Sequence, residues 1–114
     1  MNVESVAALT GAVPLTEKDG LRAEISGGIC CDLLSHVLAH GAPGAVWITV
    51  QTHMNVVAIA SLRKMACVIA AGSAPVAADV CAQAQREGIA ILSSEKSAFA
   101  LCSLLGAAGL ADAE

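Results

Sequence analysis

Residues 45–70 read AVWITVQTHMNVVAIASLRKMACVIA. Residues 45–50 are apolar or β-branched, a composition typical of a strand buried on both faces, and residues 66–70 repeat it. Between these segments, apolar residues recur at helical spacing, from a cap at Thr52 or His53 to about Lys64. The stretch therefore predicts two parallel strands joined by a helix.

The same alternation extends on both sides of this unit. Beyond residue 70, a turn at 72–75 leads into a helix through residue 87, a strand at 89–92, and a helix that residues 93–95 are expected to cap. The elements expected before residue 45 are a helix ending at Gly11, an extended piece at 12–15, a turn at 17–20, a strand at 23–29 and a helix at about 32–39. The order predicts an α/β fold, a three-layer domain with a largely parallel central sheet, which occupies residues 1–114 as a single domain.

The composition excludes several classes of protein. The 114 residues are 56% apolar and 14% charged, which is too apolar for a disordered chain. A formal net charge of -4, six Lys and Arg, and two aromatic residues (one Trp and one Phe) argue against a nucleic-acid partner.

A membrane span is also not expected. Residues 33–59 carry no Asp, Glu, Lys or Arg, but His, Gly, Pro, Gln and Asn interrupt them too often for a spanning helix. The first residues lack the basic and apolar regions of a signal peptide. We therefore expect a cytoplasmic protein with no membrane partner.

Five cysteines are spread along the chain without a C-x-x-C pair: Cys30, Cys31, Cys67, Cys81 and Cys102. An odd, scattered set favours reduced thiols packed as small apolar side chains over a disulfide framework or a metal site. His36 and His40 share a helix face, but no third ligand is evident. We predict no metal and no cofactor, while a redox or metal role for Cys30 or Cys31 stays open.

Polar residues and glycines follow the expected strands, where ligands bind in open α/β sheets. The residues expected at this edge, and hence the predicted ligand-binding residues, are Gly28, Cys31, Asp32, Gln51, Thr52, His53, Asn55, Gly72, Ser73, Ser93 and Ser94. They suit a small anion or a nucleotide. The alternative is that the Ser, Thr and Asp residues only cap helices, and Asp32 in particular is expected to open one. Glu95 and Lys96 are interpreted as ordinary solvated residues.

Motifs of common enzymes are missing from the sequence. It contains no phosphate-binding G-x-x-x-x-G-K-[ST] loop, no G-x-G-x-x-G, no G-x-S-x-G and no H-E-x-x-H. Catalysis by His53 with Asp32 or a cysteine is a lesser alternative, because nothing in the spacing demands it. We predict a non-catalytic module without catalytic residues.

Four runs of residues resemble the DRTGG domain family, in particular its small stand-alone members, over nearly the whole chain. They are EISGG at 24–28, CDLLS at 31–35, WITVQTHMNVVA at 47–58 and GIAILS at 88–93, and the run at 47–58 is the most specific of them. Of the pentapeptide that names the family, only Gly27 and Gly28 are kept, with Glu24, Ile25 and Ser26 in the other places.

This resemblance implies a compact α/β domain, similar in fold to the N-terminal domain of HPr kinase/phosphatase. Such domains serve as regulatory or dimer-forming modules beside CBS domains in regulated pyrophosphatases and within some phosphotransacetylases. Stand-alone members have been associated with iron-only hydrogenases. The resemblance thus favours a regulatory or ligand-sensing module, with an accessory interaction protein of an iron-only hydrogenase or other redox complex as the alternative.

The apolar excess predicts a second copy of the chain as partner. Residues 97–111 contain no charge, and apolar residues occupy more than one face of the helix expected there. We expect a homodimer with this helix, or the helix containing residues 56–62, at or near the interface.

Overall fold

The protein is described by a computed structural model that covers the backbone of residues 1–114 and all side chains except those of Lys18 and Asp19. Its centre is a five-stranded sheet in the order β1-β5-β4-β3-β2, in which only β1 is antiparallel to its neighbour. The strands are β1 (Val13–Pro14), β2 (Gly27–Cys30), β3 (Ala45–Thr49), β4 (Cys67–Ala70) and β5 (Ala90–Ser93).

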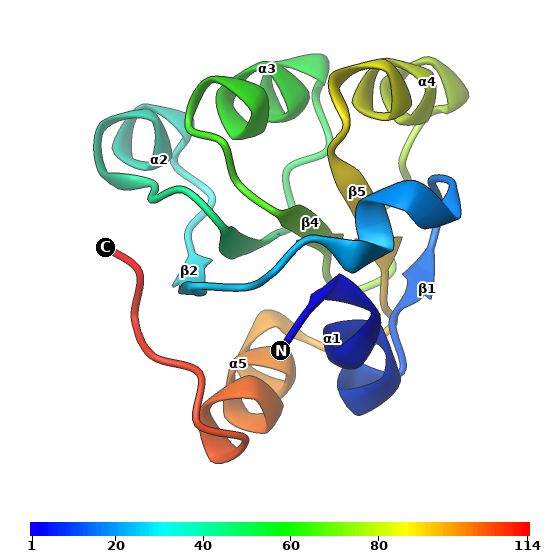
Figure 1. Cartoon of the computed structure of the whole chain (residues 1–114). Helices are drawn as coiled ribbons and strands as arrows, with labels where there is room; N and C mark the ends of the chain where they lie inside the picture. Colours follow the sequence, from blue (N-terminus) through cyan, green and yellow to red (C-terminus); the bar gives the residue numbers. More distant parts are fainter.

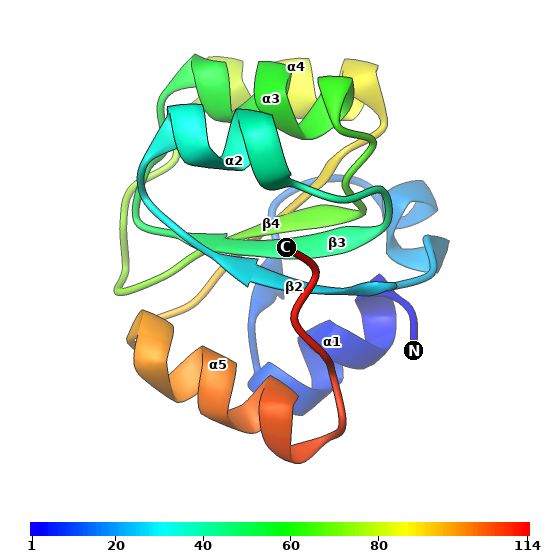
Figure 2. The same ribbon diagram turned by 90° about the vertical axis from the view of Figure 1, so that its left-hand side faces the viewer.

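Helices cover both faces of the sheet, which gives three layers and confirms the predicted fold class (Figures 1 and 2). One face carries α2 (Leu34–His40), α3 (Met54–Leu62) and α4 (Ala78–Glu87). The other carries α1 (Val3–Thr10) and α5 (Ala98–Ala107). A 3-10 helix, η1 (Lys18–Arg22), stands where the sequence predicts only a turn.

The path of the chain through the sheet fixes where a crevice can form. Strands β2, β3, β4 and β5 are neighbours in chain order, so α2, α3 and α4 each connect adjacent parallel strands and lie on the same face. After β5 the chain crosses to the opposite face as α5 (Figure 1). The connections leaving β4 and β5 therefore diverge, and this divergence is what opens a ligand crevice in α/β sheets.

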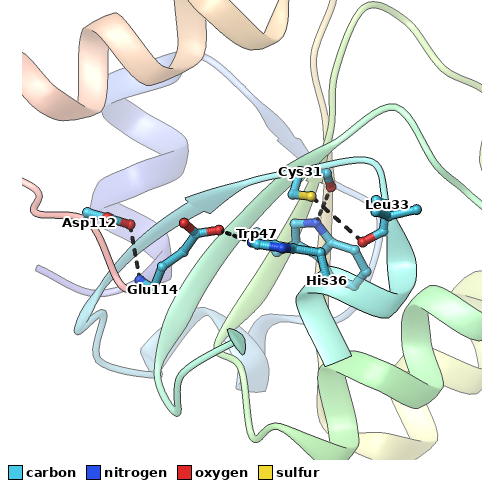
Figure 3. Close-up of polar contacts among 6 residues, drawn as sticks. All are labelled: Cys31, Leu33, His36, Trp47, Asp112 and Glu114. Atoms are coloured by element: carbon cyan, nitrogen blue, oxygen red, sulfur yellow. Dashed lines mark hydrogen bonds and ion pairs between the residues drawn. The ribbon is translucent and has the colours of Figure 1, made fainter. Parts of the chain in front are cut away.

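The core lies on both sides of β3, which is fully buried as expected from its composition. Trp47 and Ile29 pack toward α2, α3 and α4, whereas Val46 and Ile48 pack toward α1 and α5. Side chains alternate between the faces because successive strand residues point to opposite sides. The Trp47 indole N–H donates to the Cys31 carbonyl at 2.8 Å, so its one polar group is satisfied (Figure 3).

The free edge of β2 is covered by the C-terminal tail (residues 108–114), an arrangement not expected from the sequence (Figure 2). The Gly28 N–H donates to the Ala111 carbonyl at 2.9 Å, and the Gly28 carbonyl accepts from the Ala113 N–H at 2.9 Å. A Cβ on Gly27 would lie 2.9 Å from the Ala111 oxygen. The close approach of the tail therefore explains why Gly27 and Gly28 lack side chains. The tail also leaves less of the β2 edge free to pair with another chain.

Several element boundaries differ from the expectation. The strand expected at residues 23–29 begins only at Gly27, because residue 24 forms an isolated bridge with residue 2. The cap of α5 is Ser97, whose hydroxyl accepts from the Ala100 N–H at 3.2 Å, and the expectation of a cap at residues 93–95 is wrong. Ser93 instead ends β5, and residues 94 and 95 belong to the loop that leads to α5 on the far face.

None of the helices over residues 1–114 is both long and apolar enough to cross a membrane.

Candidate functional site

The predicted ligand-binding residues fall into two groups at the carboxyl edge of the sheet, with one exception. Gly28 lies inside β2, where the tail takes up its N–H and carbonyl, and so it is not at this edge. The first group follows β2 and β3 and comprises Cys31, Asp32, Gln51, Thr52, His53 and Asn55. The second lies at the ends of β4 and β5 and comprises Gly72, Ser73, Ser93, which is the last residue of β5, and Ser94.

In the first group, Asp32 holds two loops together. Its Oδ1 accepts a hydrogen bond from the Thr49 hydroxyl at 2.8 Å and another from the Val50 N–H at 2.9 Å. The buried Thr49 hydroxyl in turn accepts from the Gln51 N–H at 3.0 Å. Asp32 therefore does not cap a helix as predicted: α2 begins at Leu34, and its N-cap, Leu33, makes no side-chain hydrogen bond.

His53 is the N-cap of α3, one of the two positions that the sequence suggested. Its Nδ1 accepts from the Asn55 N–H at 3.0 Å, so the neutral ring carries its proton on Nε2. The Cys31 thiol donates to the Leu33 carbonyl at 3.7 Å (Figure 3). His53, Asp32 and Cys31 thus each bond to a different partner, and these bonds do not form the nucleophile–base pair that covalent catalysis needs.

In the second group, Ser73, Ser93 and Ser94 line an open cavity of about 690 Å³ where the connections of β4 and β5 diverge, whereas Gly72 is not part of its wall. Its wall comes from three segments: the end of α1 with β1, the loop after β4, and the loop after β5. The lining residues are Gly11, Val13, Leu15, Ser73, Ala74, Pro75, Val76, Ser93, Ser94, Glu95 and Lys96. We call this space the β4–β5 cavity.

Two backbone hydrogen bonds join the loops on either side of this cavity. The Gly72 N–H donates to the Lys96 carbonyl and the Ser73 N–H donates to the Ser94 carbonyl, both at 2.8 Å. Gly72 and Ser73 have φ angles of 63° and 58°. Glycine adopts this left-handed region freely, but for serine it is uncommon and costs free energy. The structure thus holds Ser73 in a strained turn at the cavity wall.

Lys96 reaches across the cavity rim to α1. Its ammonium group donates to the Thr10 carbonyl at 2.8 Å, at the C-terminal end of α1, where the helix dipole favours a positive charge. Its backbone N–H donates to the Ser94 hydroxyl at 3.0 Å. These contacts differ from the expectation that Lys96 is an ordinary solvated residue. A contact between positions 86 residues apart leaves no signal in local sequence, so no pattern could have revealed it.

The chemistry of the β4–β5 cavity is mixed. Val13, Leu15 and Val76 offer apolar surface, while Ser93 and the Lys96 ammonium offer polar contacts. An ammonium group has three donors, of which Thr10 takes one. The cavity can therefore hold a ligand with a flat apolar part and an anionic part, although the Glu95 carboxylate at the rim disfavours a large negative charge there.

Metal binding finds no geometric support in the described side chains. Among them, no three His, Cys, Asp or Glu residues are grouped as ligands for an ion. His36 and His40 do share a helix face, with ring centroids 4.5 Å apart, and His36 Nε2 lies 2.6 Å from a Glu114 carboxylate oxygen (Figure 3). These two histidines thus pack together, and one of them contacts the tail.

Comparison with known proteins supports the fold. A crystal structure of the CBS and DRTGG domains from the regulatory region of Clostridium perfringens pyrophosphatase, in complex with its activator diadenosine tetraphosphate, superposes with a TM-score of 0.68 at 11% sequence identity. The match covers 91% of this chain and 45% of that one, so this chain spans less than half of the matched chain. No family model matches the sequence, and no curated protein matches it significantly. The fold of this protein is similar to that of the CBS and DRTGG region of a pyrophosphatase.

Proposed function

We propose that this chain is a single DRTGG-like domain that acts as a non-catalytic regulatory or ligand-sensing module, in the cytoplasm and as a homodimer. Its ligand is a small anion or a nucleotide, bound at the carboxyl edge of the strands. The observation that carries the proposal is the β4–β5 cavity, which lies where the chain changes faces of the sheet.

The cavity suits a nucleotide in size and in chemistry. Its volume of about 690 Å³ lies within the range of roughly 300–1,000 Å³ that is common for small-molecule sites. Val13 and Leu15 provide apolar surface for a base, and the Lys96 ammonium with the Ser93 hydroxyl provides donors for a phosphate. The pyrophosphatase region of similar fold was crystallised with diadenosine tetraphosphate, which supports a nucleotide as the first ligand to test.

The proposal is tested by calorimetric titration and thermal shift with AMP, ATP, diadenosine tetraphosphate, acetyl phosphate and inorganic phosphate. A ligand at 100 times its Kd stabilises the folded state by about 2.7 kcal/mol, which a thermal shift detects readily. Lys96→Gln should weaken binding by roughly tenfold or more, because it removes a charge-assisted hydrogen bond. If none of these compounds binds, the ligand-sensing part of the proposal is refuted.

Lys64→Gln is the matched control for Lys96→Gln. Lys64 precedes β4 and therefore lies at the opposite edge of the sheet from the cavity. The Lys64 variant should bind like the wild type. Equal weakening in both variants would mean that the ligand responds to overall charge and not to the β4–β5 cavity. Because Lys96 also contacts Thr10, affinity is measured well below the melting temperature of each variant.

The homodimer is supported by apolar side chains that the single chain leaves exposed. Leu62 on α3 is 70% exposed, and Phe99 on α5 is 83% exposed. These lie on the two helices that the sequence favoured for an interface. Light scattering at micromolar concentration should give twice the mass of the chain, and a monomer would contradict the dimer.

The second candidate is an accessory protein of an iron-only hydrogenase or another redox complex. A groove of about 370 Å³ between α2 and α3 favours it, since Leu34, Leu38, Ile59 and Leu62 line the groove. Binding of purified hydrogenase, weakened by Leu38→Gln, would support this function over ligand sensing.

A further inference from the structure

A groove of about 230 Å³ lies between β2 and α5, beneath the C-terminal tail, and contains two thiols. Cys30 is the last residue of β2, and Cys102 lies in α5. Leu105 and Leu110 add apolar surface. This groove is separate from the β4–β5 cavity, and none of the contacts described above for the ligand site involves either cysteine.

The two thiols are neighbours although they are far apart in sequence. The Cys30 and Cys102 side chains both line the groove between β2 and α5. Partial burial, together with the Cys102 thiol, raises the pKa of Cys30 from 9.0 to about 11. Two thiols that line one groove, one of which raises the pKa of the other, constitute a pair and not two isolated cysteines.

The adjacent Cys31 does not belong to this pair. Strand geometry sends successive side chains to opposite faces of a sheet. Accordingly, Cys31 packs against the core cluster under α2, α3 and α4, whereas Cys102 packs against the cluster under α1 and α5. The fold therefore selects Cys30 over Cys31 as the partner of Cys102.

We propose that Cys30 and Cys102 are a reversible dithiol–disulfide pair that covalently joins β2 to α5 when a small disulfide such as oxidised glutathione is in excess. This inference goes beyond the proposed function and does not depend on it.

The reaction is a two-step thiol–disulfide exchange. The Cys30 thiolate attacks one sulfur of the small disulfide, forms a mixed disulfide and releases one glutathione thiolate. The Cys102 thiolate then attacks the Cys30 sulfur and releases the second. Two electrons pass from the protein thiols to the small disulfide, and the two protons lost by the cysteines are taken up by the two glutathione thiolates.

The surroundings of Cys30 and Cys102 determine how fast the disulfide forms and how much it stabilises the fold. Only the thiolate attacks, and a thiol with its pKa near 11 is almost fully protonated at pH 7, so the first step should accelerate about tenfold per pH unit between pH 7 and 9. The product closes a long loop of the chain. We expect the melting temperature of the oxidised protein to rise by roughly 5 °C or more.

Peptide mapping tests the proposal on the intact chain. The folded protein is treated with oxidised glutathione, its remaining thiols are alkylated, and it is digested with trypsin without reduction. Cleavage after Arg22, Arg63 and Lys96 places Cys30 and Cys31 in the peptide 23–63 and Cys102 in the peptide 97–114. The expected result is one species that links these two peptides and is resolved by reduction.

Variants assign the link within the peptide 23–63. Cys31→Ser should retain the link and the rise in melting temperature, whereas Cys30→Ser and Cys102→Ser should lose both. Cys81→Ser, a change on α4 across the sheet, is the matched control and should behave like the wild type. A link through Cys31, or stable glutathione adducts on Cys30 and Cys102 without a link, would overturn the proposal. Circular dichroism verifies that each variant is folded. If a variant does not fold, the peptide map of the wild-type protein still shows whether the two peptides are linked.

Discussion

The hydrogen bond between Asp32 and Thr49 gives the sharpest prediction about stability. Thr49 is 0% exposed, and its hydroxyl donates to Asp32 Oδ1 at 2.8 Å and accepts from the Gln51 N–H at 3.0 Å. Thr49→Val keeps the shape of the side chain but removes both bonds. A hydrogen bond to a charged group contributes about 1.5–3 kcal/mol. Because Asp32 is exposed and water can replace the lost donor, we expect a loss of about 1.5 kcal/mol, at the low end of that range.

A double-mutant cycle isolates this contact from the other effects of the two substitutions. Asp32→Ala removes the acceptor of both the Thr49 hydroxyl and the Val50 N–H and should cost about 2 kcal/mol. The double variant should lose about 1 kcal/mol less than the sum of the single variants, because the shared bond is counted twice in that sum. Urea unfolding, followed by the fluorescence of Trp47, the single tryptophan, measures all four proteins.

Additive losses, within about 0.3 kcal/mol, would refute the reasoning, because residues that share a bond cannot behave independently. Such a result would mean that Asp32 does not join the loop after β2 to the end of β3.

Three further predictions concern the tail, the buried thiol and the interface. Gly27→Ala should destabilise the protein by about 1–3 kcal/mol, because the new Cβ would lie 2.9 Å from the Ala111 oxygen and would displace the tail. Gly106→Ala is its control, with nothing within 4 Å of the new Cβ, and should be neutral or slightly stabilising in the same urea assay. Burial raises the pKa of the Cys67 thiol from 9.0 to about 12, so the folded state holds a proton that the unfolded chain releases above pH 9. The stability that this thiol contributes is complete below pH 9 and should fall by up to about 1.4 kcal/mol per pH unit between pH 9 and 12. Cys67→Ala should flatten that part of the stability–pH curve, and an unchanged slope would contradict the assignment. Leu62→Gln should leave the free energy of unfolding of the single chain within about 0.5 kcal/mol, because Leu62 is 70% exposed, and should weaken the homodimer in light scattering. Leu9→Gln, a change on α1, is the control that should keep the dimer.

The sheet and most of its helices could be predicted from local sequence, because their signals are local. The run at residues 45–50 is apolar and β-branched, and it forms the buried central strand β3. Gly88 ends α4 with a φ of 73°, the left-handed conformation that glycine adopts most easily. His53 caps α3 within one residue of the first expectation.

The candidate site was less predictable, because its contacts join distant parts of the chain. The sequence predicted that Ser73, Ser93 and Ser94 lie at the carboxyl edge of the sheet together with Asp32 and His53, and it did not reveal that the serines line a cavity while Asp32 and His53 bond to neighbouring backbone and side chains. Asp32 lies close to the start of α2, as a cap does, yet it bonds to the end of β3. A residue just before a helix has the same place in the sequence whether it caps that helix or bonds to a neighbouring strand. Only the position of β3 in the folded structure shows that Asp32 does the second.

By itself, then, the sequence determined the order and type of the elements, because hydrophobic period, β-branching and glycine turns act over a few residues. Only the tertiary structure decided which face each connection takes, and with it the place of the β4–β5 cavity. The hydrogen bond of Lys96 to Thr10, the hydrogen bonds of the tail to Gly28 and the groove that Cys30 and Cys102 share were likewise decided only by the tertiary structure. Each depends on two segments that meet only after the sheet has assembled, and the residues near either segment carry no record of the other.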